Sequence, residues 1–276
     1  MKNKRILITG GAGSIGSELA RQLSPNNKIF LLDINETDVY QVREQIRNEV
    51  HDHWIYSRTG DVRNKETLRD LFEDFKPQVV FHAAALKNVT PGEEYPQETI
   101  DTNVQGTANM IAEAKRWECL EKFVFISTDK VVNAHCIMGM TKKLAEGLVT
   151  KAGHEFVAVR FGNVLGSSGS VLEIWERQVK NGDPITITDE KMERYMMTIP
   201  EACELVIEAS KGKNGEIYIL DMGKKVNILE LAMKYHPYHP QEIIGIRDGE
   251  TLSEELMTEE EEKRAIKQGR FYILKP

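Results

Sequence analysis

The sequence predicts an α/β protein built on a doubly wound parallel sheet, with a smaller C-terminal region partly interleaved with it. Two observations carry this prediction. Short apolar runs, typical of strands buried on both faces, alternate with amphipathic stretches of helical length through the first 160 residues. A glycine-rich turn joins the first strand to the first helix. After about Asn163 the rhythm becomes irregular, so we expect one domain over 1–165 and a second region over 166–276, parts of which return to the sheet.

The individual elements follow from the same patterns. Asn64 is placed to cap the third helix, and the acidic run 259–262 suits the start of the last one. Strands are expected at 5–8, 28–33, 54–56, 79–82, 123–127, 156–160, 185–187 and 216–220. Helices are expected at 14–23, 37–50, 65–75, 101–118, 141–152, 171–181, 200–209 and 258–268.

Composition limits the functional classes. The chain has 276 residues, 41% hydrophobic and 29% charged, which excludes a disordered or fibrous protein. Lys plus Arg number 36 against 43 Asp plus Glu, and the net charge of −7 argues against a nucleic-acid partner. No apolar run approaches the roughly 18 to 20 residues of a membrane helix, and residues 1–9 are too short for a signal peptide. We therefore expect a cytoplasmic protein with no membrane partner.

No metal site is expected. Cys119, Cys136 and Cys203 are too far apart for a zinc pattern or a disulfide framework. The segment 236–240 holds two histidines, but its prolines suit a turn and no cysteine or carboxylate cluster accompanies it.

The glycine turn predicts a dinucleotide site on a Rossmann-like sheet. Glycines at 10, 11, 13 and 16 satisfy G-x-G-x-x-G directly between a strand and a helix, where backbone N–H groups approach a pyrophosphate. A purely structural glycine turn is the alternative. The residues assigned to the cofactor here are Gly10, Gly13, Ser14, Ile15 and Gly16. Region 1–165 is thus the dinucleotide-binding domain and 166–276 the substrate-binding region.

Two acids support the same interpretation. Asp33 ends the second strand, 23 residues after Gly10, where an acid accepts hydrogen bonds from ribose hydroxyls. It would repel a 2′-phosphate, so NAD is favoured over NADP, although Asp33 can also simply cap the next turn. Asp61 is placed to contact the adenine edge, or else to stabilise its own turn.

Nine motifs together resemble the extended short-chain dehydrogenase/reductase family, in its polysaccharide-biosynthesis branch of UDP-N-acetylglucosamine 4,6-dehydratases. The glycine loop is common to many families, whereas STDK, GNVLGSSGSV and RYMMTIPEA are far more specific. The motifs are TGGAGSIGSEL (9–19), GDVR (60–63), HAAALKNV (82–89), NVQGTAN (103–109), STDK (127–130), RFGNVLGSSGSV (160–171), RYMMTIPEA (194–202), LDMG (220–223) and GIRDGETLSEEL (245–256).

The resemblance implies a reaction and its residues. Family members oxidise C4 of a nucleotide-linked hexose with tightly held NAD(P), eliminate water across C5 and C6, and return hydride to C6, so the cofactor is regenerated each cycle. Thr128 would orient O4, and Asp129 would protonate the departing O6 hydroxyl, with proton transfer at O4 as its second candidate role. Lys130 would remove the C5 proton, which requires a neutral amine. A surface ion pair between Asp129 and Lys130 is the alternative.

One position departs from the family's Y-x-x-x-K helix. Lys142 fits the lysine, which binds nicotinamide ribose, but Met138 stands where tyrosine is usual. A thioether cannot take the O4 proton. Because some dehydratases of this branch carry methionine here, the departure sharpens the assignment and leaves the C4 oxidation base open.

The remaining assignments also rest on the resemblance. Lys87 would face cofactor or sugar, or else solvent, and Asn103 would cap its helix or brace the site. Arg194 and Arg247 would neutralise phosphates, with surface salt bridges as the alternative. The other residues assigned to the cofactor site are Val62, Ala83, Ala84, Ala85, Lys87 and Asn103. The residues assigned to the UDP-N-acetylglucosamine site are Lys87, Asn163, Arg194, Arg247 and Glu250.

The expected protein is a dehydratase that retains the configuration at C5, since position 138 is not tyrosine. A C5-inverting dehydratase, a nucleotide-sugar 4-epimerase or reductase, and a catalytically inactive NAD-binding sensor stay open. We expect a homo-oligomer paired through the helices at 101–118 and 141–152. Since the phosphate loop begins at Gly10, we also expect a catalytic unit with nothing ahead of it.

Overall fold

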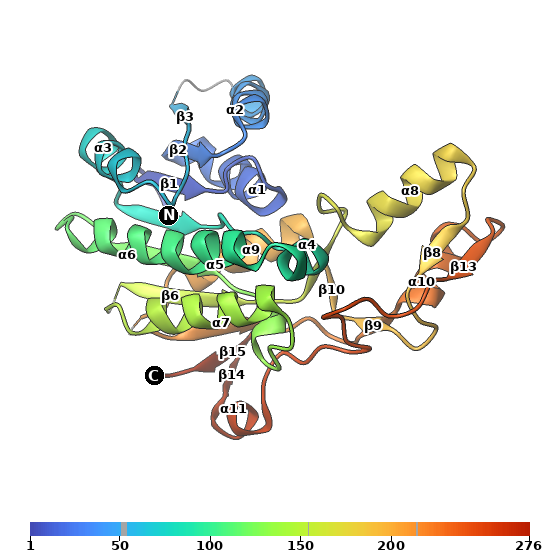
Figure 1. Cartoon of the computed structure of the whole chain (residues 1–276). Helices are drawn as coiled ribbons and strands as arrows, with labels where there is room; N and C mark the ends of the chain where they lie inside the picture. Colours follow the sequence, from blue (N-terminus) through green and yellow to red (C-terminus); the bar gives the residue numbers. More distant parts are fainter. Residues whose placement is uncertain (51–53, 154, 214) are drawn as a thin grey trace.

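A mostly parallel sheet runs through the centre of the computed structural model, which describes residues 1–50, 54–153, 155–213 and 215–276 (Figure 1). Within these residues its strands are β1 (Arg5–Thr9), β2 (Lys28–Asp33), β3 (Ile55–Thr59), β4 (Val79–His82), β5 (Lys122–Ile126), β6 (Phe156–Arg160), β11 (Ile217–Leu220), β14 (Ile266–Gln268) and β15 (Phe271–Leu274). Their order is β14-β15-β11-β6-β5-β4-β1-β2-β3, and all neighbours from β3 to β11 pair in parallel. The order reverses between β1 and β4, where such sheets bind ligands beyond the carboxyl ends of the strands.

Helices cover both faces of the sheet, as a doubly wound fold requires. Alternation along β1 sends Ile6 and Ile8 into one buried cluster and Leu7 into the other. The first cluster lies under α1 (Ser14–Leu23), α2 (Glu36–Val50) and α9 (Ile199–Ala209). The second lies under α3 (Lys65–Phe75), α6 (Thr107–Lys115) and α7 (Ile137–Thr150). The predicted fold class is confirmed.

The chain between β4 and α6 is more broken than predicted. The expected helix at 101–118 begins as a π-helical segment, η2 (Asp101–Gly106), and α6 ends at Lys115. Two short helices precede it, α4 (Val89–Glu94) and α5 (Pro96–Ile100).

Helix α7 covers Ile137–Thr150, so it starts four residues earlier than predicted. A Cβ at Gly139 would lie 2.5 Å from the Lys130 carbonyl oxygen, so the glycine serves close packing of the first helical turn.

The predicted C-terminal helix at 258–268 was too long. Helix α11 covers only Glu259–Arg264, and Thr258 and Glu261 form its capping box. The chain then forms β14, which turns at Gly269 (φ +57°) and pairs antiparallel with β15. The antiparallel hairpin of β14 and β15 therefore forms this edge of the sheet.

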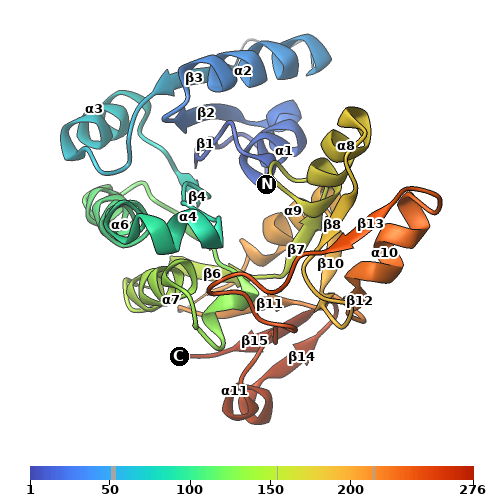
Figure 2. The ribbon, with the colours of Figure 1, turned by 45° about the vertical axis from the view of Figure 1, so that its right-hand side comes forward.

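A smaller group of elements stands beside the carboxyl edge of the sheet (Figure 2). Its core is Trp175, Ile185, Ile187, Met192, Ile228, Leu231 and Ala232. Its elements are β7 (Asn163–Leu165), α8 (Val171–Asn181), β8 (Ile185–Ile187), β9 (Glu193–Arg194), β10 (Met196–Thr198), β12 (Val226–Asn227), α10 (Ile228–Tyr235) and β13 (Gln241–Ile243), whereas the short η3 (Asp129–Val131) directly follows β5 at the sheet. β7 pairs with β10, β9 with β12 and β8 with β13. Among the residues described, no helix combines the length and apolar character needed to cross a membrane.

Candidate active site

A cleft of about 950 Å³ opens where the parallel strands end. This is near the upper end of the roughly 300 to 1,000 Å³ of small-molecule pockets. Residues that end or follow the strands line it, among them Gly10, Asp33, Ala83, Ser127 and Phe161. The predicted site residues that also line it are Gly13, Ser14, Ile15, Gly16, Asp61, Val62, Ala84, Ala85, Lys87, Thr128, Lys130, Met138, Lys142, Asn163, Arg247 and Glu250. Asn103, Asp129 and Arg194 do not.

The glycine loop forms one end of the cleft. Gly10 has φ +66°, and a Cβ there would lie 2.7 Å from backbone atoms of Ala83 and Ala84. A Cβ at Gly16 would lie 2.1 Å from the Gly10 carbonyl oxygen, so α1 packs directly against the turn. Gly13, at the N-cap of α1, offers no capping side chain. The loop is therefore a backbone cradle of the kind that holds a pyrophosphate, and a nicotinamide dinucleotide fits these residues.

Two carboxylates flank this cradle. Asp33 Oδ2 accepts from the Ala12 N–H at 3.0 Å, so its carboxylate also stabilises the glycine loop. Asp61 Oδ2 pairs with the guanidinium of Arg63 at 2.5 Å. Burial works against the Asp61 charge, but the hydrogen bonds from Arg63 prevail and lower the pKa of Asp61. The guanidinium of Arg63, which also lines the cleft, is thus already paired.

A buried polar chain fixes the loop after β4. His82, which the sequence reasoning missed, lies between the hydroxyls of Thr9 (Nδ1, 2.6 Å) and Thr107 (Nε2, 3.0 Å). Burial, with a smaller effect of Lys142, lowers the pKa of His82 to about 3, so the ring is neutral. Since the Thr107 hydroxyl donates to the Asn103 carbonyl, His82 Nε2 must donate and Nδ1 must accept. The sequence offers one signal for this role, because His82 ends a strand that is otherwise apolar.

Asn103 holds the same loop from the other side. Its amide accepts from the Leu86 N–H at 2.8 Å and donates to the Leu86 carbonyl at 3.0 Å and to the Thr141 hydroxyl at 3.0 Å. With these bonds made and 1% of the residue exposed, the amide braces the cleft wall.

Thr128, Asp129 and Lys130 form a compact cluster beyond β5. Thr128 caps η3, and its hydroxyl donates to Asp129 Oδ1 at 3.0 Å. Lys130 Nζ donates to the same oxygen at 3.0 Å and to Asn163 Oδ1 at 3.4 Å. Asp129 is fully buried behind its two neighbours, and its Oδ2 has no hydrogen-bond partner among the described residues. A Cβ at Gly162 would lie 2.9 Å from that oxygen, so the glycine makes room for it.

Met138 and Lys142 lie one helical turn apart on α7. Met138 is 3% exposed and contributes a thioether to the cleft wall. Lys142 Nζ donates to the Ile126 carbonyl at 2.5 Å and lies 4.0 Å from the centre of the Phe125 ring. Burial lowers the pKa of Lys142 to about 7, although Glu146 opposes the shift. Its amine thus changes charge near neutral pH.

A buried ionic network supports this wall from behind. The Ser127 hydroxyl donates to Glu146 at 2.5 Å, and Glu146 pairs with Arg160 at 2.7 Å. Arg160 also pairs with Glu261 of α11 at 2.9 Å. Burial opposes the Arg160 charge, but Glu146 and Glu261 raise its pKa. The network links the residue before Thr128 to the C-terminal helix.

The substrate half of the cleft is built from the later chain. Lys87 Nζ donates to the Ser168 carbonyl at 2.6 Å, while the Ser168 N–H donates to the Ser14 hydroxyl at 3.0 Å. Arg194 is buried and donates to the carbonyls of residues 193, 251 and 252 at 2.7 to 3.0 Å. It therefore holds the segment 251–252 and is not brought to the cleft.

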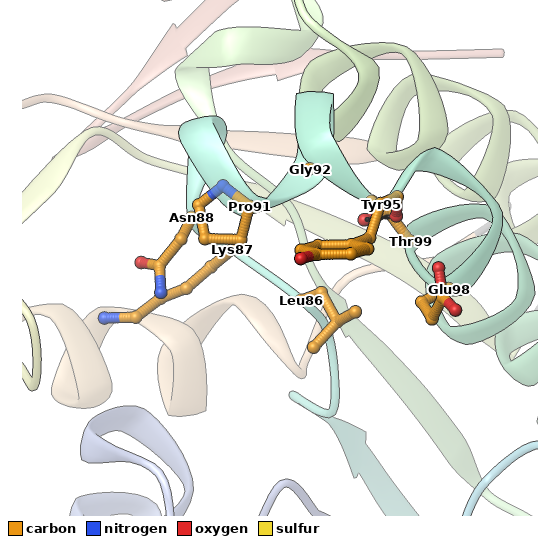
Figure 3. Close-up of a pocket in the computed structure, with 8 residues that line it drawn as sticks. All are labelled: Leu86, Lys87, Asn88, Pro91, Gly92, Tyr95, Glu98 and Thr99. Carbon is orange, nitrogen blue, oxygen red and sulfur yellow. Dashed lines mark hydrogen bonds between the residues drawn. The ribbon is translucent and has the colours of Figure 1, made fainter.

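A smaller hollow of about 280 Å³ adjoins the cleft through Leu86, Lys87, Asn88, Pro91 and Glu98. Figure 3 shows the Tyr95 ring beside Leu86, with the Lys87 amine pointing away from the ring. The described residues contain no group of three or more His, Cys, Asp or Glu that could hold a metal ion.

Comparison with known proteins agrees with this architecture. The family described as "Polysaccharide biosynthesis protein" matches residues 6–276. The capsular polysaccharide biosynthesis protein CapD of Staphylococcus aureus is 42% identical over 277 residues, which cover 95% of this chain and 46% of CapD. The chain spans about half the length of the curated relatives it matches first.

Two further similarities extend over most of this chain and most of the protein compared with it. The X-ray structure of Pen from Bacillus thuringiensis is 36% identical with a TM-score of 0.89, covering 99% of this chain and 88% of Pen. The UDP-glucose 4-epimerase of Rickettsia bellii is 33% identical, covering 98% of this chain and 82% of the epimerase.

Proposed function

Since this chain belongs to the polysaccharide-biosynthesis branch of the extended short-chain dehydrogenase/reductase family, we propose that it is a UDP-N-acetylglucosamine 4,6-dehydratase with tightly held NAD(P). The product would be a UDP-4-keto-6-deoxy-N-acetylhexosamine. The observation that carries the proposal is that Thr128, Lys130, Met138 and Lys142 line one wall of the cleft, with methionine four residues before the lysine.

The glycine cradle, Asp33 and Lys142 would hold the cofactor. When bound, the nicotinamide accepts hydride from C4 and returns it to C6. Asp33 would accept from the ribose hydroxyls and repel a 2′-phosphate, and the pairing of Arg63 with Asp61 leaves that phosphate without a free cation from Arg63. NAD is therefore the preferred cofactor, and tighter binding of NADP than of NAD would contradict this.

The O4 proton needs an acceptor other than tyrosine. Because the Thr128 hydroxyl donates to Asp129, an O4–H that donates to Thr128 can pass its proton to the buried carboxylate through the hydroxyl. The same carboxyl group would later protonate the departing O6 hydroxyl, so the O4 proton leaves in water. Lys130, which faces the cleft, would take the C5 proton and return it to C5.

Return of that proton by the same amine favours retention at C5. Proton NMR of the product distinguishes retention from inversion by the H4 and H5 couplings. For the substrate, Arg247 would bind the diphosphate and Glu250 the ribose or uracil.

The decisive experiment is incubation of the protein with UDP-N-acetylglucosamine and no added reductant. We expect a product with a C6 methyl signal, and its loss in Asp129→Asn and Lys130→Ala. A protein with bound cofactor and no product would instead favour a sensor.

A 4-epimerase is the second candidate, because the Rickettsia relative carries that name. An epimerase inverts C4 and leaves the C6 hydroxyl in place, so a product without a methyl signal supports it. The buried Asp129 beside Lys130 favours the dehydratase, since elimination needs an acid and a base on the C5–C6 side.

The proposal includes self-association through α7. Met140, Leu144 and Leu148 recur every four residues and are 46%, 61% and 42% exposed. Leu144→Glu is expected to shift the mass in solution towards the monomer.

A further inference from the structure

Glu254 is a buried glutamate that has no part in the proposed binding of cofactor or substrate. It is 8% exposed, and its Oε1 lies 3.9 Å from Lys130 Nζ. That separation is too long for a hydrogen bond but within the range of an ion pair. Glu254 is thus a second carboxylate on the amine that faces the cleft.

The chain around Glu254 is held in place from two sides. Arg194 donates to the carbonyls of Thr251 and Leu252, and the Glu193 N–H also donates to Leu252 at 2.9 Å. On the far side of this segment Lys225 Nζ binds Ser253 at 2.8 Å and Glu255 at 2.5 Å. The residues on either side of Glu254 are therefore committed to Lys225, while Glu254 itself approaches Lys130.

The surroundings of Lys130 are mainly acidic. Asp129 Oδ1 lies 3.0 Å from Nζ on the η3 side, and Asn163 Oδ1, a neutral acceptor, lies 3.4 Å away on β7. The Cys136 thiol at the start of α7 interacts electrostatically with Lys130, and Glu93 of α4 interacts with that thiol. An ammonium group at Nζ is consequently held between two carboxylates on different segments.

We propose that Glu254 is a positioning residue for Lys130, which keeps the amine directed into the cleft. The inference rests on the proposed function only in taking Lys130 as the base at C5. Neutral Lys130 takes the C5 proton and becomes an ammonium ion, and that ion returns the proton to C5. Glu254 itself gains and loses no proton. Its carboxylate holds Nζ on one side of the cleft, so the proton returns to the face of C5 from which it was taken.

The first test does not depend on activity. Lys130 acylation by acetic anhydride is measured by peptide mass spectrometry, with exposed Lys143 as the internal reference. In Glu254→Gln the Lys130 amine loses one of its two carboxylate partners, and its labelling near pH 7 increases several-fold. Glu254→Asp, which keeps the charge, gives an intermediate increase. Glu259→Gln, the same change at an exposed glutamate, leaves the labelling unaltered.

The second test uses the dehydration reaction. In Glu254→Gln kcat falls several-fold while KM for UDP-N-acetylglucosamine stays near the parental value, and Glu254→Asp recovers part of the loss. Glu259→Gln matches the parent in both constants. Unchanged Lys130 labelling in folded Glu254→Gln and Glu254→Asp overturns the inference, as does a change confined to KM. If the parent makes no product but the labelling changes as expected, the proposed function fails and the pairing of Glu254 with Lys130 stands.

Discussion

The two walls of the cleft are held together in different ways. The cofactor wall consists of residues that end or follow parallel strands, and glycines and short backbone contacts place them. The substrate wall consists of segments after Asn163 that long-range side chains hold, such as Arg194 on residues 251–252 and Lys87 on Ser168. A local pattern defines the first wall, whereas contacts between distant residues define the second. Mutations should therefore damage the first wall by crowding and the second by loss of polar anchors.

The largest effect is expected from crowding at Gly16. Alanine normally favours a helix over glycine by about 1 kcal/mol, but here its Cβ would lie 2.1 Å from the Gly10 carbonyl oxygen. Gly16→Ala should weaken NAD binding by roughly 5- to 150-fold, the range that corresponds to a cost of about 1–3 kcal/mol for overpacking. Calorimetric titration with NAD measures it.

Gly147 provides the matched control on α7, since a Cβ there would meet nothing within 4 Å. Gly147→Ala should bind NAD normally and unfold at slightly higher temperature. Near-parental NAD affinity in Gly16→Ala would remove the distinction between the walls.

On the substrate wall the two arginines should differ. Arg194→Ala removes the guanidinium donor from three carbonyl groups, of which Leu252 keeps the Glu193 N–H, and we expect a loss of about 3 kcal/mol in the free energy of unfolding. Arg247 is exposed, so Arg247→Ala should change stability by less than about 0.5 kcal/mol. Its loss of a charge-assisted contact should raise KM about tenfold. Urea unfolding measures the change in stability, and steady-state kinetics measure the change in KM. A raised KM with unchanged stability in Arg194→Ala would indicate that Arg194 binds phosphate after all.

These differences explain what the sequence could and could not predict. Strand–turn–helix patterns placed the sheet, the glycine cradle and Asp33, because each is defined within about 25 residues. The role of Arg194 could not be predicted, because its partners are nearly 60 residues away in an irregular segment. The start of α7 at Ile137 was not predicted, and the close packing of its Gly139 against the Lys130 carbonyl is a contact that the sequence does not show. Glu254 had no signal of its own, since an acidic residue in a loop is ordinarily solvated.

The two walls meet at Lys142, where pH should reveal the cost of burial. Its pKa falls from 10.5 unfolded to about 7 folded, so between these values the unfolded chain binds more protons. The free energy of unfolding of the cofactor-free protein should therefore rise from pH 7 to 10. Below pH 7 the buried Lys142 destabilises the folded protein by its full amount. Urea unfolding of Lys142→Met should show a flatter profile over this window, with exposed Lys143→Met as the control. Equal slopes in parent and Lys142→Met would contradict a buried amine.

The smallest effects should come from two helix caps, one on each side of the comparison. Asn64 accepts from the Glu66 and Thr67 N–H groups at the start of α3, and Thr258 accepts from the Glu261 N–H at the start of α11. Replacing either by alanine should cost about 1 kcal/mol in thermal or urea unfolding.

Their effects on turnover should differ, because only one cap is connected to the active site. Glu261 pairs with Arg160, Arg160 pairs with Glu146, and Glu146 accepts from Ser127 beside Thr128. Thr258→Ala should therefore loosen this network and lower kcat a few-fold, while Asn64→Ala leaves kcat unchanged at the same loss of stability. If both variants have the same kcat, the network from Glu261 to Ser127 stabilises the fold alone and does not hold Thr128 in the active site.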